Sequence, residues 1–247
     1  MRYAAVGDSF TEGLGDELPD GSQRGWADLV AAGLPDPDVR YANFAVRGRL
    51  LRPIVEEQIE AALALDPAPT VMTFNGGGND MMRPGTDLAG LLALIERGIR
   101  RCVEAGVRLV VVAGPNPSQR LPFGGSIDRK GEILTVETQK LAAGHGVEFA
   151  DVFHDLEIRK APYWSPDRLH LNAAGHRRAA GLVLTAMGYA SAAHVVDPGP
   201  AESRRILDEA RYYREHVLPW VQRRLRGRSS GDDRTGKYLA WTAVKAG

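Results

Sequence analysis

The chain turns from a strand into a helix within Val6-Gly7-Asp8-Ser9-Phe10-Thr11-Glu12-Gly13. Residues 1–5 favour an incoming strand, and Gly7 permits a tight exit from it because glycine has no Cβ. A serine at such a turn can point its hydroxyl into a cleft, beside the free N–H groups of the helix start. Ser9 therefore combines what a nucleophile needs: exposure, and nearby donors for an oxyanion.

Ser9 also has a purely structural interpretation. It could be the N-cap of the next helix, with Glu12 three residues later completing a capping box. The stretch alone does not decide between the two interpretations. The decision depends on the partners that the rest of the chain supplies.

Strand-like and helix-like segments alternate along the chain. The strand-like segments after the first are 40–45, 70–74, 107–113 and 147–150, and the helix-like ones are 26–34, 50–65, 86–105, 131–143 and 172–187. This repeated order predicts a parallel sheet with helices on both faces. The apolar run 107–113 is typical of a central parallel strand. The Pro- and Gly-rich stretch 114–128 is too long for a mere connector, so it is a candidate wall of an active site.

Size and composition limit the class of protein. The 247 residues suffice for one large α/β domain, and 31 basic residues balance 31 acidic ones, so charge does not point to nucleic acid or an anionic membrane surface. The single Cys102 excludes an internal disulfide and is expected to be a buried small hydrophobe. No apolar run approaches the ~20 residues of a membrane span, and no signal peptide is evident, so we expect a cytoplasmic protein.

The character of the chain changes after about residue 190. A long helical pattern over 201–225 precedes an arginine-rich stretch at 223–228 and the aromatic end Tyr238-Leu239-Ala240-Trp241. We expect a core domain at 1–189 and a C-terminal helical extension and tail at 190–247 that dock on it. The docking stripe would be Ile206, Ala210, Tyr213, Val217 and Trp220. The alternative is an arm that contacts another subunit in a homo-oligomer or binds an anionic group.

A second polar cluster lies near the end of the core, in Ser165–His176. Pro166 prevents a continuous helix, which places Asp167 and His170 in a loop before the last core helix. An Asp three residues before a His can hold the imidazole Nδ1 and leave Nε2 free as a base. By itself this spacing is common and favours an N-cap aspartate and an exposed histidine; Ser9 is what favours the catalytic interpretation.

Two turns can supply oxyanion donors. Asn79, in Gly76-Gly77-Gly78-Asn79-Asp80, can point its amide into the cleft, and Gly48, at the end of 43–48, can offer a backbone N–H. Both turns follow strands, at the edge where open α/β sheets bind ligands. The triple glycine lacks the spacing of a dinucleotide- or phosphate-binding loop.

These blocks resemble the SGNH hydrolases, also called GDSL esterases/lipases. The resemblance rests on Gly7-Asp8-Ser9, Asn43 to Gly48, Gly77-Gly78-Asn79-Asp80 and Asp167-Arg168-Leu169-His170, in this order. It spans roughly residues 1–187 and implies a flavodoxin-like three-layer α/β/α sandwich with five parallel strands and no metal or other cofactor. It says nothing about the extension.

The resemblance also implies roles for individual residues. Ser9 would be the nucleophile and, through its backbone N–H, an oxyanion donor, and Gly48 and Asn79 would be the other two donors. His170 would be the general base and Asp167 its orienting acid. The implied reaction is two-step acyl transfer from a small-molecule ester with a short to medium acyl or O-acetyl group.

Two alternatives stay open. A lysophospholipase or thioesterase would need an apolar acyl tunnel, of which the loop 114–125 gives no sign. A catalytically silent binding protein of the same fold usually lacks a triad member or oxyanion donor, and here all five residues are present. Four loop arginines are expected at the rim of the cleft: Arg47, Arg49, Arg83 and Arg120. We expect them to be solvated surface side chains rather than ligands of an anionic substrate.

Overall fold

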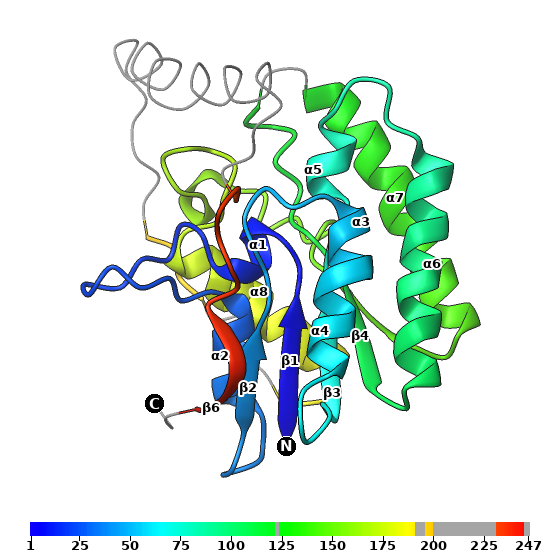
Figure 1. Ribbon diagram of the computed structural model, residues 1–247. Helices are drawn as coiled ribbons and strands as arrows, with labels where there is room; N and C mark the ends of the chain where they lie inside the picture. Colours follow the sequence, from blue (N-terminus) through cyan, green and yellow to red (C-terminus); the bar gives the residue numbers. More distant parts are fainter. Residues whose placement is uncertain (122–123, 191–195, 200–230, 245–247) are drawn as a thin grey trace.

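The computed structural model describes residues 1–121, 124–190, 196–199 and 231–244, and it has a single six-stranded sheet in that part of the chain (Figure 1). The strand order is β5-β4-β3-β1-β2-β6. The first five strands pair in parallel: β1 (Arg2–Val6), β2 (Arg40–Asn43), β3 (Val71–Phe74), β4 (Arg108–Ala113) and β5 (Glu148–Asp151). The predicted parallel α/β architecture is therefore confirmed.

Helices cover both faces of the sheet and create two hydrophobic cores. One face packs on α2 (Trp26–Gly33) and α8 (Ala173–Ala186), and the other on α4 (Ile59–Leu63), α6 (Leu88–Glu104) and α7 (Gly124–Gly144). Alternate residues of β1 enter different cores, because successive strand side chains point to opposite faces. Strands covered on both sides must be apolar throughout, which explains the continuous apolar run of β4.

Two helices differ from the expected ones. The pattern at 50–65 is divided into α3 (Leu51–Pro53), a π-helical turn (Ile54–Gln58) and α4. Helix α7 begins at Gly124, seven residues before the expected start, so the preceding loop is shorter than predicted. Gly124 and Gly125 have low helix propensity and conceal this first turn, which is held in place by burial of Ile127.

The five expected parallel strands are present, and the tail adds a sixth, antiparallel strand that was not expected. Strand β6 (Tyr238–Ala243) pairs antiparallel with β2, and the ring of Tyr238 packs edge-on against Tyr41 at 5.8 Å between centroids. An antiparallel edge strand needs no crossover helix, so it lacks the alternation from which the other strands were predicted. The proposed docking stripe (Ile206 to Trp220) and the arginine-rich stretch lie outside the described residues.

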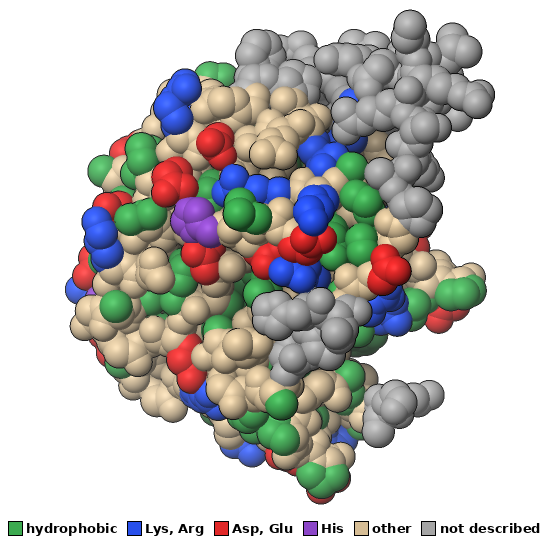
Figure 2. All heavy atoms as spheres, turned by 180° about the vertical axis from the view of Figure 1, so that it is seen from behind, with side chains coloured by type: hydrophobic (Ala, Val, Ile, Leu, Met, Phe, Trp, Pro, Cys, Tyr) green, Lys and Arg blue, Asp and Glu red, His purple; other side chains and the backbone are tan. Residues whose placement is uncertain are grey.

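The surface agrees with the balanced composition. On the described part of the face shown in Figure 2, acidic and basic side chains are interspersed rather than gathered by sign. Within the described ranges, no helix is both long enough and apolar enough to cross a bilayer.

Candidate active site

Ser9 is the first residue of α1 (Ser9–Glu12), immediately after the turn that leaves β1. Asp8 is the N-cap of this helix, and its Oδ1 accepts the N–H of Phe10 at 3.1 Å. The capping-box interpretation of Ser9 is therefore wrong, and its hydroxyl is available for other partners. The turn requires glycine at position 7, where a Cβ would lie 2.4 Å from Oγ1 of Thr11.

A chain of short hydrogen bonds joins Ser9, His170 and Asp167. Ser9 Oγ lies 2.9 Å from His170 Nε2, and His170 Nδ1 lies 2.6 Å from Asp167 Oδ2. The other carboxylate oxygen of Asp167 accepts the Ser165 hydroxyl at 2.6 Å and the backbone N–H groups of Leu169 and His170 at 3.0 Å each. The loop is thus fixed around the carboxylate.

The hydrogen bonds to Asp167 determine its charge. Burial raises the pKa of this carboxyl, but hydrogen bonds from His170 and Ser165 outweigh burial and hold the pKa well below its usual range. An ionised Asp167 accepts the Nδ1–H of His170, which leaves the Nε2 lone pair directed at the Ser9 hydroxyl. This arrangement can remove a proton from Ser9.

Gly48 and Asn79 line the same cavity as Ser9. Gly48 has a left-handed backbone with φ 73°, a conformation that favours glycine. Asn79 lies on α5 (Gly78–Met81), and its Nδ2 donates to Asp8 Oδ2 and to the Arg49 carbonyl, both at 3.1 Å. The predicted donors thus come from separate turns at the carboxyl edge of the sheet, although the amide of Asn79 also has protein acceptors.

Asp8 is a buried carboxyl beside the nucleophile. Its Oδ2 faces the amide of Asn79, and burial raises its pKa to about 6. Its hydrogen-bond partners are the N–H of Phe10 and the amide of Asn79 rather than His170, so it ties the turn together.

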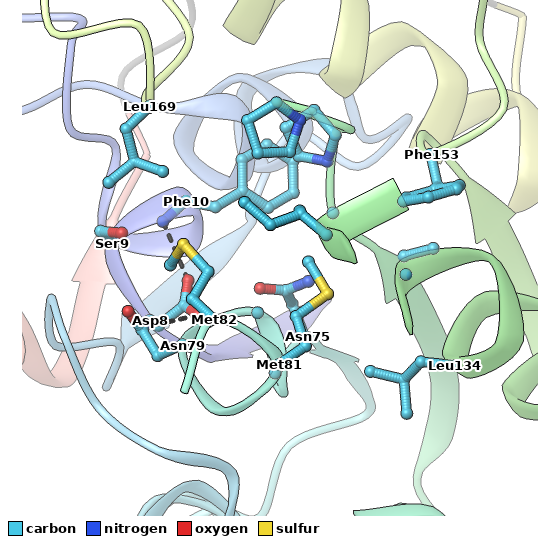
Figure 3. Close-up of a pocket in the computed structure, with 18 of the residues that line it drawn as sticks. Asp8, Ser9, Phe10, Asn75, Asn79, Met81, Met82, Leu134, Phe153 and Leu169 are labelled. Atoms are coloured by element: carbon cyan, nitrogen blue, oxygen red, sulfur yellow. Dashed lines mark hydrogen bonds between the residues drawn. The ribbon is translucent and has the colours of Figure 1, made fainter. Parts of the chain in front are cut away.

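The cavity at Ser9 has a volume of about 540 Å³ and extends well beyond the triad. In Figure 3, Ser9 and Leu169 lie at one side, Met81 and Met82 in the middle, and Leu134 and Phe153 at the opposite side. Helices α5, α6 and α7 and Phe153 contribute to its apolar wall, and the loop expected to be a wall of the site adds Pro115, Pro117 and Leu121. The loop 114–125 gave no sign of an apolar tunnel in the sequence, but a largely apolar cavity lies beside Ser9 and this loop lines part of it.

Comparison with known protein families identifies the family of this chain. A family model described as GDSL-like Lipase/Acylhydrolase family matches residues 5–178. The chain belongs to this family. A search of curated proteins gave no match.

Solved structures share the fold of this GDSL-like hydrolase. TesA is 21% identical, with a TM-score of 0.62 over 76% of this chain and 98% of that chain. A variant of Axe2, an acetyl xylan esterase from Geobacillus stearothermophilus, is 18% identical, with a TM-score of 0.60 over 76% and 95%. The psychrotrophic esterase EstA from Pseudoalteromonas sp. is 16% identical, with a TM-score of 0.57 over 76% and 96%.

Sequence reasoning missed two side chains that support the site of this GDSL-like hydrolase. Glu12 does not form a capping box; its carboxylate accepts the backbone N–H and the guanidinium of Arg47. Lys237, in the tail, donates to the carbonyls of Glu12 and Gln23 and to the carboxylate of Asp28. Because Arg47 pairs with Glu12, it is not one of the solvated arginines expected at the rim of the cleft.

The tail passes very close to the loop that carries Gly48. At Gly231 a Cβ would lie 1.9 Å from the carbonyl oxygen of Arg47, and at Gly236 it would lie 2.6 Å from that of Asn43. Only glycine allows such an approach. Residues beyond the family match therefore pack directly on the candidate oxyanion loop.

The buried His176 has a structural role. Its Nδ1 accepts the N–H of Trp26 at 3.1 Å and its Nε2 donates to the carbonyl of Leu14 at 2.9 Å, while burial lowers its pKa to about 4. A neutral ring thus ties α2 to the segment after α1. Among the residues that the structure describes, no group of three or more His, Cys, Asp and Glu is arranged to hold a metal ion.

Proposed function

We propose that this GDSL-like hydrolase cleaves carboxylic esters through a covalent acyl-enzyme on Ser9. The observation that carries the proposal is the continuous chain from Ser9 Oγ to His170 (2.9 Å) and on to Asp167 (2.6 Å). Membership of the acylhydrolase family supports the same reaction class.

In the proposed acylation, His170 Nε2 accepts the Ser9 proton as Oγ attacks the ester carbonyl carbon. The resulting tetrahedral oxyanion accepts hydrogen bonds from the backbone N–H groups of Ser9 and Gly48 and from Nδ2 of Asn79. The imidazolium, stabilised by Asp167, then protonates the leaving alcohol as the C–O bond breaks. The products of this step are a free alcohol and an acyl group on Ser9.

In the proposed deacylation, water takes the place of the alcohol. His170 removes a proton from the water as its oxygen attacks the acyl carbon, and then returns a proton to Ser9 Oγ as the second C–O bond breaks. A carboxylic acid leaves. The small-molecule substrate is therefore an ester, and the chemistry requires no group beyond the residues named and water.

Hydrolysis of p-nitrophenyl esters from acetate to palmitate tests the proposal. We expect Ser9→Ala to lower kcat by at least 1000-fold, because no nucleophile remains, while Ser22→Ala at an exposed serine leaves kcat unchanged. A fluorophosphonate should label the wild type at Ser9. Activity that survives in Ser9→Ala, or a wild type that neither hydrolyses esters nor is labelled, would favour the silent binding protein.

A further inference from the structure

One apolar wall of the cavity follows a single face of α7. Ile127, Gly131, Leu134 and Thr138 line it at intervals of three to four residues, the spacing of one helix face. From Ile127 to Thr138 the helix rises ~16 Å. Ile95 on α6 adds a further wall. The cavity thus runs from the triad down between the two helices and the sheet.

The amide of Asn75 and the ammonium of Lys130 already have partners along this stretch, whereas the buried Thr138 hydroxyl has none. Asn75 Nδ2 donates to the Val112 carbonyl at 2.8 Å. The ammonium of Lys130 donates to the carbonyls of Met81 and Arg83 at 3.1 Å each. Ser126 and Arg83 are exposed. An occupant therefore meets mainly methyl groups, thioethers and a ring, which suit an alkyl chain and leave sugar hydroxyls without partners.

On the basis of the function proposed above, we infer that this apolar extension is an acyl pocket that binds an unbranched acyl chain of medium to long length. We define the acyl pocket by six residues: Met81, Met82, Ile95, Leu134, Thr138 and Phe153. The inference assigns the preferred substrates to acyl esters with long alkyl tails rather than to acetyl esters.

The acyl part, and not the alcohol, is the part that suits an enclosed pocket. The acyl group stays bonded to Ser9 through both steps, so contacts in the pocket act on both transition states. The alcohol must leave before water can attack, which requires an open route at the mouth. Met81 and Met82, midway along the cavity (Figure 3), can adjust to chains of different length, because their side chains are unbranched and flexible.

Thr138 and Ile95 determine the length of chain that fits. Thr138 is the residue farthest along α7 that lines the cavity, and its side chain is buried with Oγ1 lacking a hydrogen-bond partner. Replacing it therefore breaks no hydrogen bond. A larger apolar side chain at either position should shorten the pocket.

Two ester series test which part of the substrate enters the pocket. With p-nitrophenyl esters of increasing acyl length, we expect kcat/KM to rise about fourfold per methylene until the pocket is full. With acetate esters of increasing alcohol length, we expect little change. A flat or falling acyl series, or a rise that follows the alcohol, would overturn the inference while leaving the proposed function intact.

Substitutions of Thr138 and Ile95 test whether these residues limit the length of the acyl chain. We expect Thr138→Leu and Ile95→Phe to lower the ratio of kcat/KM on decanoate to that on acetate by at least tenfold. Gln139→Leu introduces the same side chain at the exposed neighbouring position and should not change this ratio. Fluorophosphonate labelling at Ser9 shows that each variant keeps a competent site. A labelled Thr138→Leu and a labelled Ile95→Phe that both keep the wild-type ratio would overturn the inference.

Binding of fatty acids to the inactive Ser9→Ala variant tests the acyl pocket independently of ester hydrolysis. In Ser9→Ala, we expect decanoate to bind more tightly than butyrate by calorimetry, with the negative heat-capacity change of apolar burial. Adding Thr138→Leu should weaken decanoate binding at least tenfold. If the Ser9→Ala protein binds both acids equally, the acyl pocket is excluded whether or not the wild type is an esterase.

Discussion

The carboxylate of Glu12 accepts the backbone N–H of Arg47, with 2.6 Å between Oε2 and N. Glu12 ends the helix that begins with Ser9, and Arg47 directly precedes Gly48. The other carboxylate oxygen receives the Arg47 guanidinium at 2.6 Å. One buried side chain therefore holds the candidate nucleophile and a candidate oxyanion donor in a fixed relation.

Glu12→Gln tests this relation. The variant keeps the size of the side chain but loses the charge that binds the backbone and the guanidinium together. We expect kcat on a p-nitrophenyl ester to fall about tenfold, less than the ~100-fold or more that removing an oxyanion donor costs. KM should change little, because Glu12 is not placed to touch the substrate. Glu57→Gln, at an exposed position, is the control, and an unchanged kcat in a folded Glu12→Gln would contradict the assignment.

Lys237 fastens the tail to the core. Its ammonium lies among the carbonyls of Glu12 and Gln23 and the Asp28 carboxylate, and both charged side chains are less than one-fifth exposed. Burial raises the pKa of Asp28, and the charge of Lys237 opposes that rise. We expect Lys237→Met to lower the free energy of unfolding by about 3 kcal/mol, because it leaves a buried carboxylate unpaired.

Urea unfolding measures this loss, and Lys140 offers a control. Lys140 pairs with Glu137 at the surface, so Lys140→Met should change the free energy of unfolding by less than about 1 kcal/mol. Adding Asp28→Asn to Lys237→Met should recover part of the loss. Equal effects of the two lysine variants would show that the tail is not anchored through this pair.

The sequence pointed to Ser9, His170 and Asp167, which the structure joins by hydrogen bonds, but not to the side chains that support them. Ser9, Asp167 and His170 lie in turns after strands or before a helix, and turn residues with special geometry leave a local signal. Glu12 has an equally strong local interpretation as a capping residue, so its partner in another turn stays hidden. Lys237 and β6 follow a long segment with no strand-to-helix alternation, and the pairing with β2 depends only on tertiary contacts.

The acyl pocket was missed for a different reason. Leu134 and Ile95 belong to apolar stripes of ordinary amphipathic helices. Such a stripe is the same whether its side chains fill a core or line a cavity, because periodicity reports which face is apolar and not what packs against it. Sequence reasoning instead looked for the tunnel in the Pro- and Gly-rich loop.

Asp8→Asn should change how stability depends on pH. The folded pKa of Asp8, about 6, lies above the ordinary 3.8, so the folded state binds this proton more tightly than the unfolded state. Stability from this group is therefore fully present below pH 3.8 and is lost as the pH rises through 6. Between pH 4.5 and pH 8 we expect the wild type to lose about 2 kcal/mol of unfolding free energy relative to Asp8→Asn.

Urea unfolding of both proteins at the two pH values provides this difference, and other titrating groups cancel in it. The control is Asp38→Asn at an exposed carboxyl, which should run parallel to the wild type. Parallel behaviour of Asp8→Asn as well would mean that Asp8 titrates as an ordinary surface carboxyl in spite of its burial.

Asn79→Ala tests whether the Asn79 amide donates a hydrogen bond to the transition state or only holds its loop in place. Asn79 Nδ2 donates to Asp8 and to the Arg49 carbonyl. If its role is purely structural, the substitution should lower the stability of the protein and leave kcat unchanged. An oxyanion donor should instead lower kcat 100- to 1000-fold with a small change in KM. The rate of fluorophosphonate labelling at Ser9 should fall as well, because attack at phosphorus also develops negative charge on oxygen. If Asn79→Ala lowers Tm while kcat and the labelling rate stay within about threefold of the wild type, the amide serves Asp8 and Arg49 alone, and Ser9 and Gly48 would be left as the donors.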